Sequence, residues 1–123
     1  MPAPLAVPAG KVLNQAHGQA VCAGEAVYRH CLGHFLERYQ ASAAELQSAP
    51  ADLGRIQHLV HQLKSTASYL GLEQVVAVAC EAEAAVSSPD QLDLMRWRLQ
   101  VALTEAFAAI AALLARPLDA SPG

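Results

Sequence analysis

The residues whose types and spacing best suit chemistry lie near the middle of the chain: His61, Lys64, Ser65 and Ser68. In a helix, residues three, four and seven positions apart stack on one face, so these four would form a single stripe, here called the His61 stripe. An imidazole has an ordinary pKa of about 6.5, and its neutral form can accept a phosphoryl group on a ring nitrogen. The phosphoryl group would bring roughly two negative charges, which the lysine, one turn away, would partly offset. The two serines are small and would leave clearance for a bulky docking partner.

A second stripe in the same segment is apolar, and it indicates how the segment is positioned. Its members are spaced alternately by three and four: Leu53, Ile56, Val60, Leu63, Ala67 and Leu70. This spacing predicts a helix over 53–70 that buries one side. We expect Asp52 to cap its start and Gly71 to stop it in a left-handed conformation.

The segment resembles the signature of histidine-containing phosphotransfer (Hpt) domains. In these domains the phosphorylatable histidine opens an H-x-L-K-G pattern, and a further glycine follows ten positions after it. Matches to the pattern are found at His61, Leu63, Lys64 and Gly71. Ser65 stands where the family usually has glycine, and Ser68 replaces another frequent glycine. Because both substitutes are small, we expect the docking clearance to survive, although the choice of partner is open.

The resemblance implies a phosphorelay intermediate of a two-component system. His61 would accept a phosphoryl group from a receiver-domain aspartate and pass it to another receiver domain, with Lys64 stabilising the group in transit. The partners would be receiver domains of response regulators or of a hybrid sensor kinase, and the chain would stand alone or form the C-terminal module of such a kinase. The receiver would supply both the aspartate and the magnesium, so no cofactor or metal is expected here. A cytoplasmic monomer is expected.

The second imidazole nitrogen needs a hydrogen-bond acceptor that fixes the ring and its tautomer. Glu83 is the candidate that we favour, because related domains often carry glutamate or glutamine at this offset. Glu25 and Glu81 are the alternatives, since the sequence measures no distances.

The remaining elements follow from the same periodicity. Apolar residues recur at spacings of three and four over about 24–49, 53–70, 72–86 and 89–116, and no strand-like alternation occurs. Pro50 breaks the first segment, and Ser88 and Gln91 would form a capping box around Pro89 at the start of the last. The predicted fold is all-α, an antiparallel up-down-up-down four-helix bundle over 11–116. A short helix over 11–17 would cover one end, with a flexible tail or linker at 1–10 and a C-terminal tail at 117–123.

Composition and charge exclude several other classes. With 123 residues the chain suits one domain, and 54 % hydrophobic but only 5 % aromatic residues favour closely packed helices. The net charge of −3 is not the positive charge that is typical of proteins that bind nucleic acid or an anionic membrane. The longest uninterrupted apolar run, 106–115, is about half of the roughly 20 residues that span a bilayer, and no signal peptide is expected. No G-x-x-x-x-G-K-[ST] phosphate loop occurs, so we expect a phosphotransfer intermediate and not an ATP-dependent kinase.

Other histidines, aromatic residues and cysteines have simpler interpretations. His58, one turn before His61, would flank the docking surface, to which Tyr69 and Leu72 could also contribute. We expect Trp97 to lie in the core or at its edge. We expect the same of the aromatic residues of the first long helix: Tyr28, Phe35 and Tyr39. The odd number of cysteines, without C-x-x-C spacing, predicts free thiols in a reducing compartment: Cys22, Cys31 and Cys80.

Two alternative functions remain open. One is a helical adaptor that binds a receiver domain without phosphotransfer, for which Ser65 in place of glycine is the only hint. The other is a metal-binding bundle that uses His30, His34 and a nearby carboxylate, because histidines at i and i+4 can share a metal. No carboxylate or cysteine completes such a site in the sequence pattern, so surface histidines are expected instead.

Overall fold

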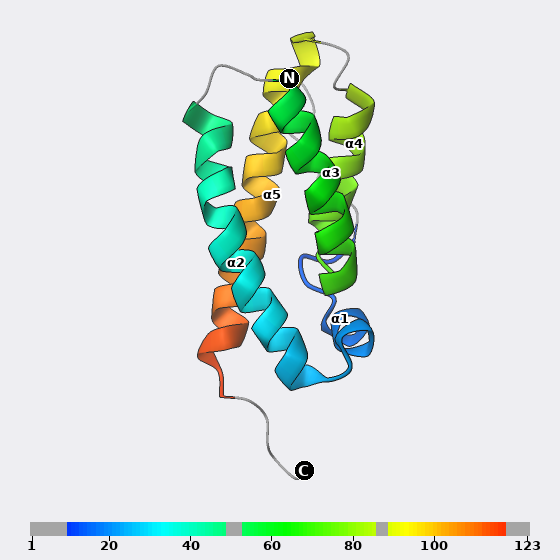
Figure 1. The fold of residues 1–123 in the computed structure, drawn as a ribbon, viewed down its shortest axis with the longest axis vertical. Helices are drawn as coiled ribbons and strands as arrows, with labels where there is room; N and C mark the ends of the chain where they lie inside the picture. The colour runs from blue at the N-terminus through cyan, green and yellow to red at the C-terminus, as the bar shows by residue number, and fades with distance from the viewer. Residues whose placement is uncertain (1–9, 49–52, 86–88, 118–123) are drawn as a thin grey trace.

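Residues 10–48, 53–85 and 89–117 are described in a computed structural model of the protein, and all their regular secondary structure is helical. The helices are α1 (Gln15–Cys22), α2 (Glu25–Ser48), α3 (Leu53–Leu70), α4 (Glu73–Ala85) and α5 (Pro89–Ala115). The all-α prediction is therefore confirmed. The four long helices lie side by side and run in alternating directions along the chain (Figure 1). Most of the two predicted tails, and the predicted caps at Asp52 and Ser88, lie outside the described residues.

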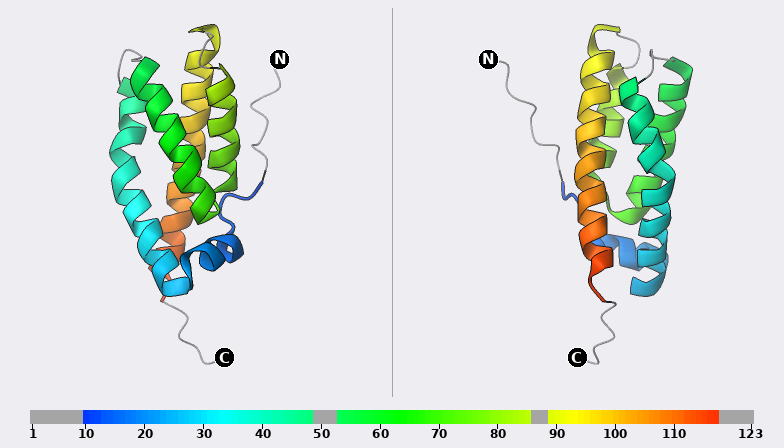
Figure 2. Two further views of the ribbon diagram at one scale, coloured as in Figure 1. Left: turned by 45° about the vertical axis from the view of Figure 1, so that its right-hand side comes forward. Right: turned by 90° about the vertical axis from the view of Figure 1, so that its left-hand side faces the viewer.

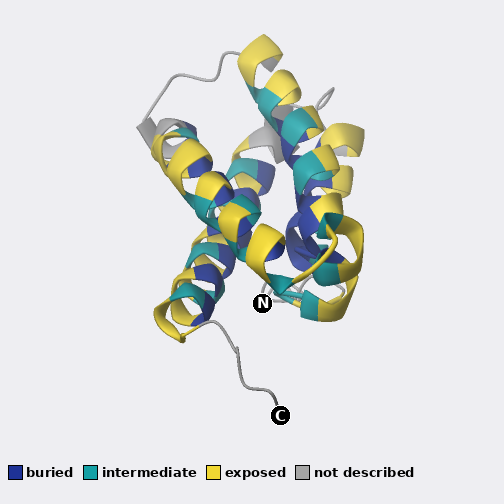
Figure 3. Cartoon of the chain, turned by 60° about the horizontal axis from the view of Figure 1, so that its bottom comes forward, coloured by how far each residue is buried: buried dark blue, intermediate teal, exposed yellow. Residues whose placement is uncertain are grey.

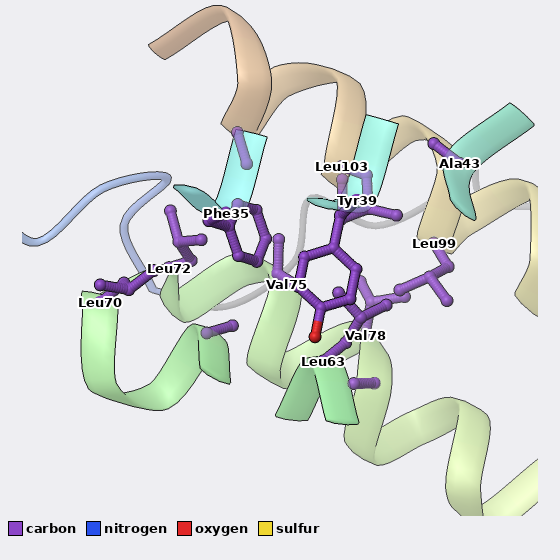
Figure 4. Packing of buried hydrophobic residues seen from close by; sticks show 14 of the residues in the cluster. Phe35, Tyr39, Ala43, Leu63, Leu70, Leu72, Val75, Val78, Leu99 and Leu103 are labelled. Atoms are coloured by element: carbon purple, nitrogen blue, oxygen red, sulfur yellow. The ribbon is translucent and has the colours of Figure 1, made fainter. Parts of the chain in front are cut away.

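The core is one cluster of apolar side chains from all four long helices. Buried residues face the interior of the bundle, and exposed residues face outward (Figure 3). The rings of Phe35 and Tyr39, whose centroids are 4.8 Å apart, project from α2 among side chains of the other long helices (Figure 4). The predicted apolar seam of α3 joins this core, because Val60, Leu63 and Ala67 are fully buried. One side of the helix that carries His61 is thus fixed by packing.

The short N-terminal helix forms, but its predicted range of 11–17 is wrong. The side chain of Asn14 accepts a hydrogen bond from the backbone N–H of His17 at 3.2 Å, so α1 begins only after this cap. The helix ends at Cys22 and is followed by its C-cap residue Ala23, whose φ of 62° is left-handed. The preceding residues are instead tied to the start of α4, where Glu73 accepts from the backbone N–H of Lys11 at 2.9 Å. α1 packs against α2 and α3 across one end of the bundle (Figure 2).

Gly71 ends α3 with a φ of +78°, a conformation that costs other residues free energy. The backbone N–H of Leu72 reaches back to the carbonyl of Ala67 at 2.9 Å, which is the long bond of a Schellman motif. A side chain at Gly71 would also collide with the segment before α1, because its Cβ would lie 2.3 Å from the Asn14 carbonyl oxygen. Both the backbone conformation and the available space therefore require glycine here.

Two arginines cap the ends of other helices. Arg29 of α2 donates to the carbonyls of Leu113 and Leu114 at 3.0 and 3.1 Å, and also to that of Arg116, at the end of α5. Arg96 of α5 donates to the carbonyl of Leu46 near the end of α2. Because the last carbonyls of a helix lack partners within it, these contacts join the ends of α2 and α5.

Helix α5 differs in two respects from the helix that the sequence predicts. Trp97 is 51 % exposed, so its predicted place in the core or at the edge of the core is wrong; with Leu94 and Val101 it lies on the outer side of the helix. The residues Asp93–Ala115 are also long and apolar enough to cross a membrane, with a mean hydropathy of 1.5. The stretch contains no uninterrupted apolar run of this length, because a few polar residues interrupt it. In the fold it is a bundle helix whose inner face, including Leu103, is buried in the core.

Candidate functional site

The His61 stripe lies along the side of α3 that faces solvent. The side chain of His61 is 70 % exposed, and Ser65 and Ser68 are also exposed. Lys64 is half-buried at the edge of the stripe that borders α4. The structure thus brings the four predicted residues together on one open face, with the imidazole accessible to a partner of protein size.

Glu83 reaches this stripe from α4, which packs against α3. One of its carboxylate oxygens, Oε1, accepts a hydrogen bond from Lys64 Nζ at 2.7 Å. The other, Oε2, lies 3.6 Å from Nδ1 of His61, slightly beyond hydrogen-bond distance. Of the alternative acceptors, Glu81 pairs with Arg98 at 2.6 Å, and Glu25 lies in the first turn of α2. Of the three candidate carboxylates, Glu83 is therefore the one that the structure places beside the imidazole.

The ion pair keeps both partners charged at neutral pH. The hydrogen bond from Lys64, with its positive charge, holds the pKa of Glu83 below its usual value. The same hydrogen bond and the charge of Glu83 raise the pKa of Lys64. Because both side chains are partly exposed, solvent screens their attraction.

The position of Glu83 distinguishes the two nitrogens of His61. A carboxylate only accepts hydrogen bonds, so it favours the tautomer in which Nδ1 carries the proton. The lone pair of the neutral ring then lies on Nε2, on the opposite side of the ring from Glu83. The His61 side chain is 70 % exposed, and a neutral imidazole nitrogen with a free lone pair is chemically able to act as a nucleophile.

Other predicted site residues divide into exposed and buried ones. His58, His30 and His34 are exposed, as expected for surface histidines, and Tyr69 is 62 % exposed. Leu72 is fully buried, so its predicted part in a docking surface is wrong; it follows the left-handed glycine and packs into the core. Within the described ranges, no three histidine, cysteine or acidic residues gather where they could hold a metal. The described residues thus give the metal-binding alternative no support.

A groove that the sequence does not predict lies beside the His61 stripe. It has a volume of about 590 Å³ and lies between α1, α2 and α3, with Phe35, Tyr39 and Leu70 among its apolar lining. Thr66 and Tyr69 line its α3 side, directly next to Ser65 and Ser68 in the sequence. The residues that line the groove come from three helices, and no local sequence pattern indicates that these residues meet.

A family model described as the Hpt domain matches residues 30–115 of the chain. This match spans well over half of the sequence and includes the His61 stripe and Glu83. The chain belongs to the Hpt family. No curated protein and no solved structure gives a significant match. Family membership makes the chain a histidine phosphotransfer module of two-component signalling, a class that interacts with receiver domains in phosphorelays and is distinct from kinases.

Proposed function

We propose that this Hpt domain is a phosphorelay intermediate whose phosphorylated residue is His61. The domain accepts the phosphoryl group from a receiver-domain aspartate and delivers it to a second receiver domain. The observation that best supports this assignment is the exposed imidazole, with Nδ1 facing Glu83 and Nε2 left open. The domain acts in the cytoplasm as a monomer. The receiver domain supplies the magnesium ion.

In the proposed reaction, the lone pair on Nε2 attacks the phosphorus of the aspartyl phosphate. A nitrogen–phosphorus bond forms, the phosphorus–oxygen bond breaks, and its electron pair leaves with the aspartate carboxylate. The proton on Nδ1 stays in place beside Glu83. Lys64, one helical turn from His61, offsets part of the charge of the transferred group, while Ser65 and Ser68 leave room for the receiver.

The test is phosphoryl transfer from a phosphorylated receiver domain to the wild-type protein, to His61→Gln and to the matched control His58→Gln. Circular dichroism checks that all three are folded. We expect an acid-labile, base-stable label on the wild type and on His58→Gln, and none on His61→Gln. A label that persists on His61→Gln but disappears from His58→Gln would move the site by one turn. Receiver binding without label on any protein would instead favour the adaptor function.

A further inference from the structure

The outer side of α5 carries an apolar surface that the bundle does not cover. Only 33 % of the most apolar part of Asp93–Ala115 is buried. Leu94, Trp97 and Val101 are all exposed on this side. A helix that is apolar on every side is normally buried on every side. Because the inner side of α5 packs in the core, its outer side is the part that still lacks a partner among the described residues.

The exposed residues of α5 follow a seven-residue repeat. Between 93 and 115 they recur at alternating spacings of three and four, and the other three exposed residues are immediate neighbours of this series. The series contains no charged residue and is here called the α5 seam: Leu94, Trp97, Val101, Thr104, Ala108, Ala111 and Ala115. This spacing is typical of a helix that packs along a second helix in a coiled coil. The pattern therefore indicates a helix as the partner of this surface.

The sizes of the seam residues indicate which helix that is. The large side chains lie in 94–101, and alanines occupy the seam positions of 108–115. A second copy in antiparallel orientation would place each large residue of one chain against a smaller residue of the other. A two-fold contact is self-complementary, so each pair would occur twice. The facing pairs would be Leu94 with Ala111, Trp97 with Ala108, and Val101 with Thr104.

We propose that the α5 seam binds the α5 seam of a second copy of this chain in antiparallel orientation. The distance between packed helices depends on the side chains at the contact. In a parallel pair Trp97 would meet Trp97 and Ala108 would meet Ala108, so the helices would be far apart at one end and close at the other. The antiparallel pair keeps one separation along the whole seam.

Pairing through α5 leaves both phosphotransfer sites open. α5 packs against α2 and α4, and the described residues show no packing between α5 and α3, so these two helices lie diagonally across the bundle (Figure 2). The His61 stripes of the two copies would therefore face away from the interface. The inference goes beyond the proposed function, because each copy transfers its phosphoryl group alone. One helix from each copy gives a small interface, so the pair exchanges with the monomer as the concentration changes.

The first test uses Trp97, the single tryptophan of the chain, as a probe of the seam. Its fluorescence emission should move to shorter wavelength as the protein concentration rises, because pairing removes water from an indole that is 51 % exposed. Analytical ultracentrifugation of the same samples should show the monomer converting to a dimer. A mass of one copy at every concentration up to about 1 mM would overturn the inference and leave the proposed function intact.

Two matched variants test the location of the interface. Trp97→Glu places a charge in the seam and should raise the dissociation constant of the pair at least about thirtyfold. Val27→Glu is the control, since Val27 is 49 % exposed but lies on α2, and it should leave the constant unchanged. Circular dichroism checks that both variants are folded. Equal constants for Trp97→Glu and wild type, or equal weakening by both variants, would overturn the inference.

Cysteine crosslinking tests the orientation. Leu94→Cys and Ala111→Cys are made as separate proteins after Cys22, Cys31 and Cys80 are replaced by alanine. An oxidised mixture of the two proteins should form disulfide-linked dimers, because position 94 of one copy faces position 111 of the other. Neither protein alone should do so, since its two cysteines would lie about 25 Å apart along the seam. Crosslinking of Leu94→Cys with itself would indicate a parallel pair and overturn the proposal.

Discussion

Replacing Tyr28 by phenylalanine tests how the end of α3 is held. Tyr28 is fully buried, and its hydroxyl donates to the backbone carbonyl of Leu70 at 2.8 Å. Phenylalanine keeps the ring but leaves the carbonyl of the last residue of α3 without this donor. A lost hydrogen bond that leaves a buried acceptor unpaired costs about 1–3 kcal/mol. We expect Tyr28→Phe to lower the free energy of unfolding by about 1.5 kcal/mol at about pH 8.

Alkaline pH should reduce this difference, because burial raises the pKa of Tyr28 to about 12. An unfolded tyrosine ionises near pH 10, so between about pH 10 and 12 the folded state binds more protons than the unfolded state. Wild-type stability therefore falls as pH rises through this window. Within this window each pH unit lowers the free energy of unfolding of the wild type by about 1.4 kcal/mol. By about pH 11 the wild type therefore loses nearly all the stability that the Tyr28 hydroxyl contributes. The phenylalanine variant lacks this loss.

Urea unfolding followed by circular dichroism at about pH 8 and about pH 11 measures both effects. Tyr69→Phe is the control, since Tyr69 is 62 % exposed, and it should change stability by less than about 0.5 kcal/mol at either pH. The reasoning fails if Tyr28→Phe is as stable as wild type near pH 8. It also fails if the difference between the two proteins is the same at both pH values.

Two further predictions concern glycines and thiols. Gly71→Ala should destabilise the protein by at least about 1–3 kcal/mol, because φ is +78° and the new Cβ would lie 2.3 Å from the Asn14 carbonyl oxygen. Gly33→Ala in α2, whose Cβ would meet only Leu114 at 3.8 Å, should instead stabilise by about 0.5–1 kcal/mol; thermal unfolding of both variants tests the contrast. Cys80 is exposed, whereas burial and the neighbouring Cys31 raise the pKa of the Cys22 thiol. Brief alkylation at neutral pH should therefore modify Cys80 before Cys22 by mass spectrometry, and preferential labelling of Cys22 would contradict this order.

The sequence predicts elements whose signals are local. The apolar spacing around Leu63 locates α3, and Pro89 does begin α5. Trp97 shows the limit of such periodicity, because it is apolar but lies outside the inner stripe of α5, and only the packing of neighbouring helices distinguishes the two faces. The start of α1 was misplaced for a different reason: the cap at Asn14 is signalled by one residue, and the hydrophobic pattern around it is weak.

In the candidate site, too, some features follow from local sequence spacing and others depend on how the helices pack together. The four residues of the His61 stripe share one helix, so their common face follows from spacing alone. Glu83 lies on another helix, and the sequence left it as one of three possible acceptors. Its pairing with Lys64 depends on how α3 and α4 are rotated against each other, which no pattern within either helix specifies.

The hydrogen bonds that hold the C-terminal end of α3 explain how the outer face of this helix can remain exposed. Near its C-terminal end, the carbonyl of Ser68 faces His17 Nε2 at 2.9 Å, that of Leu70 accepts from Tyr28, and that of Gly71 accepts from the backbone N–H of Asn14 at 2.7 Å. All three donors precede residue 30, so they lie outside the matched Hpt region. They bind backbone carbonyls at the end of the helix and leave the imidazole of His61 exposed. The phosphoacceptor role that we propose for His61 requires a side chain that is held in place yet reached by another protein. Fixing the helix from its end meets both requirements, whereas covering its outer face would meet only the first.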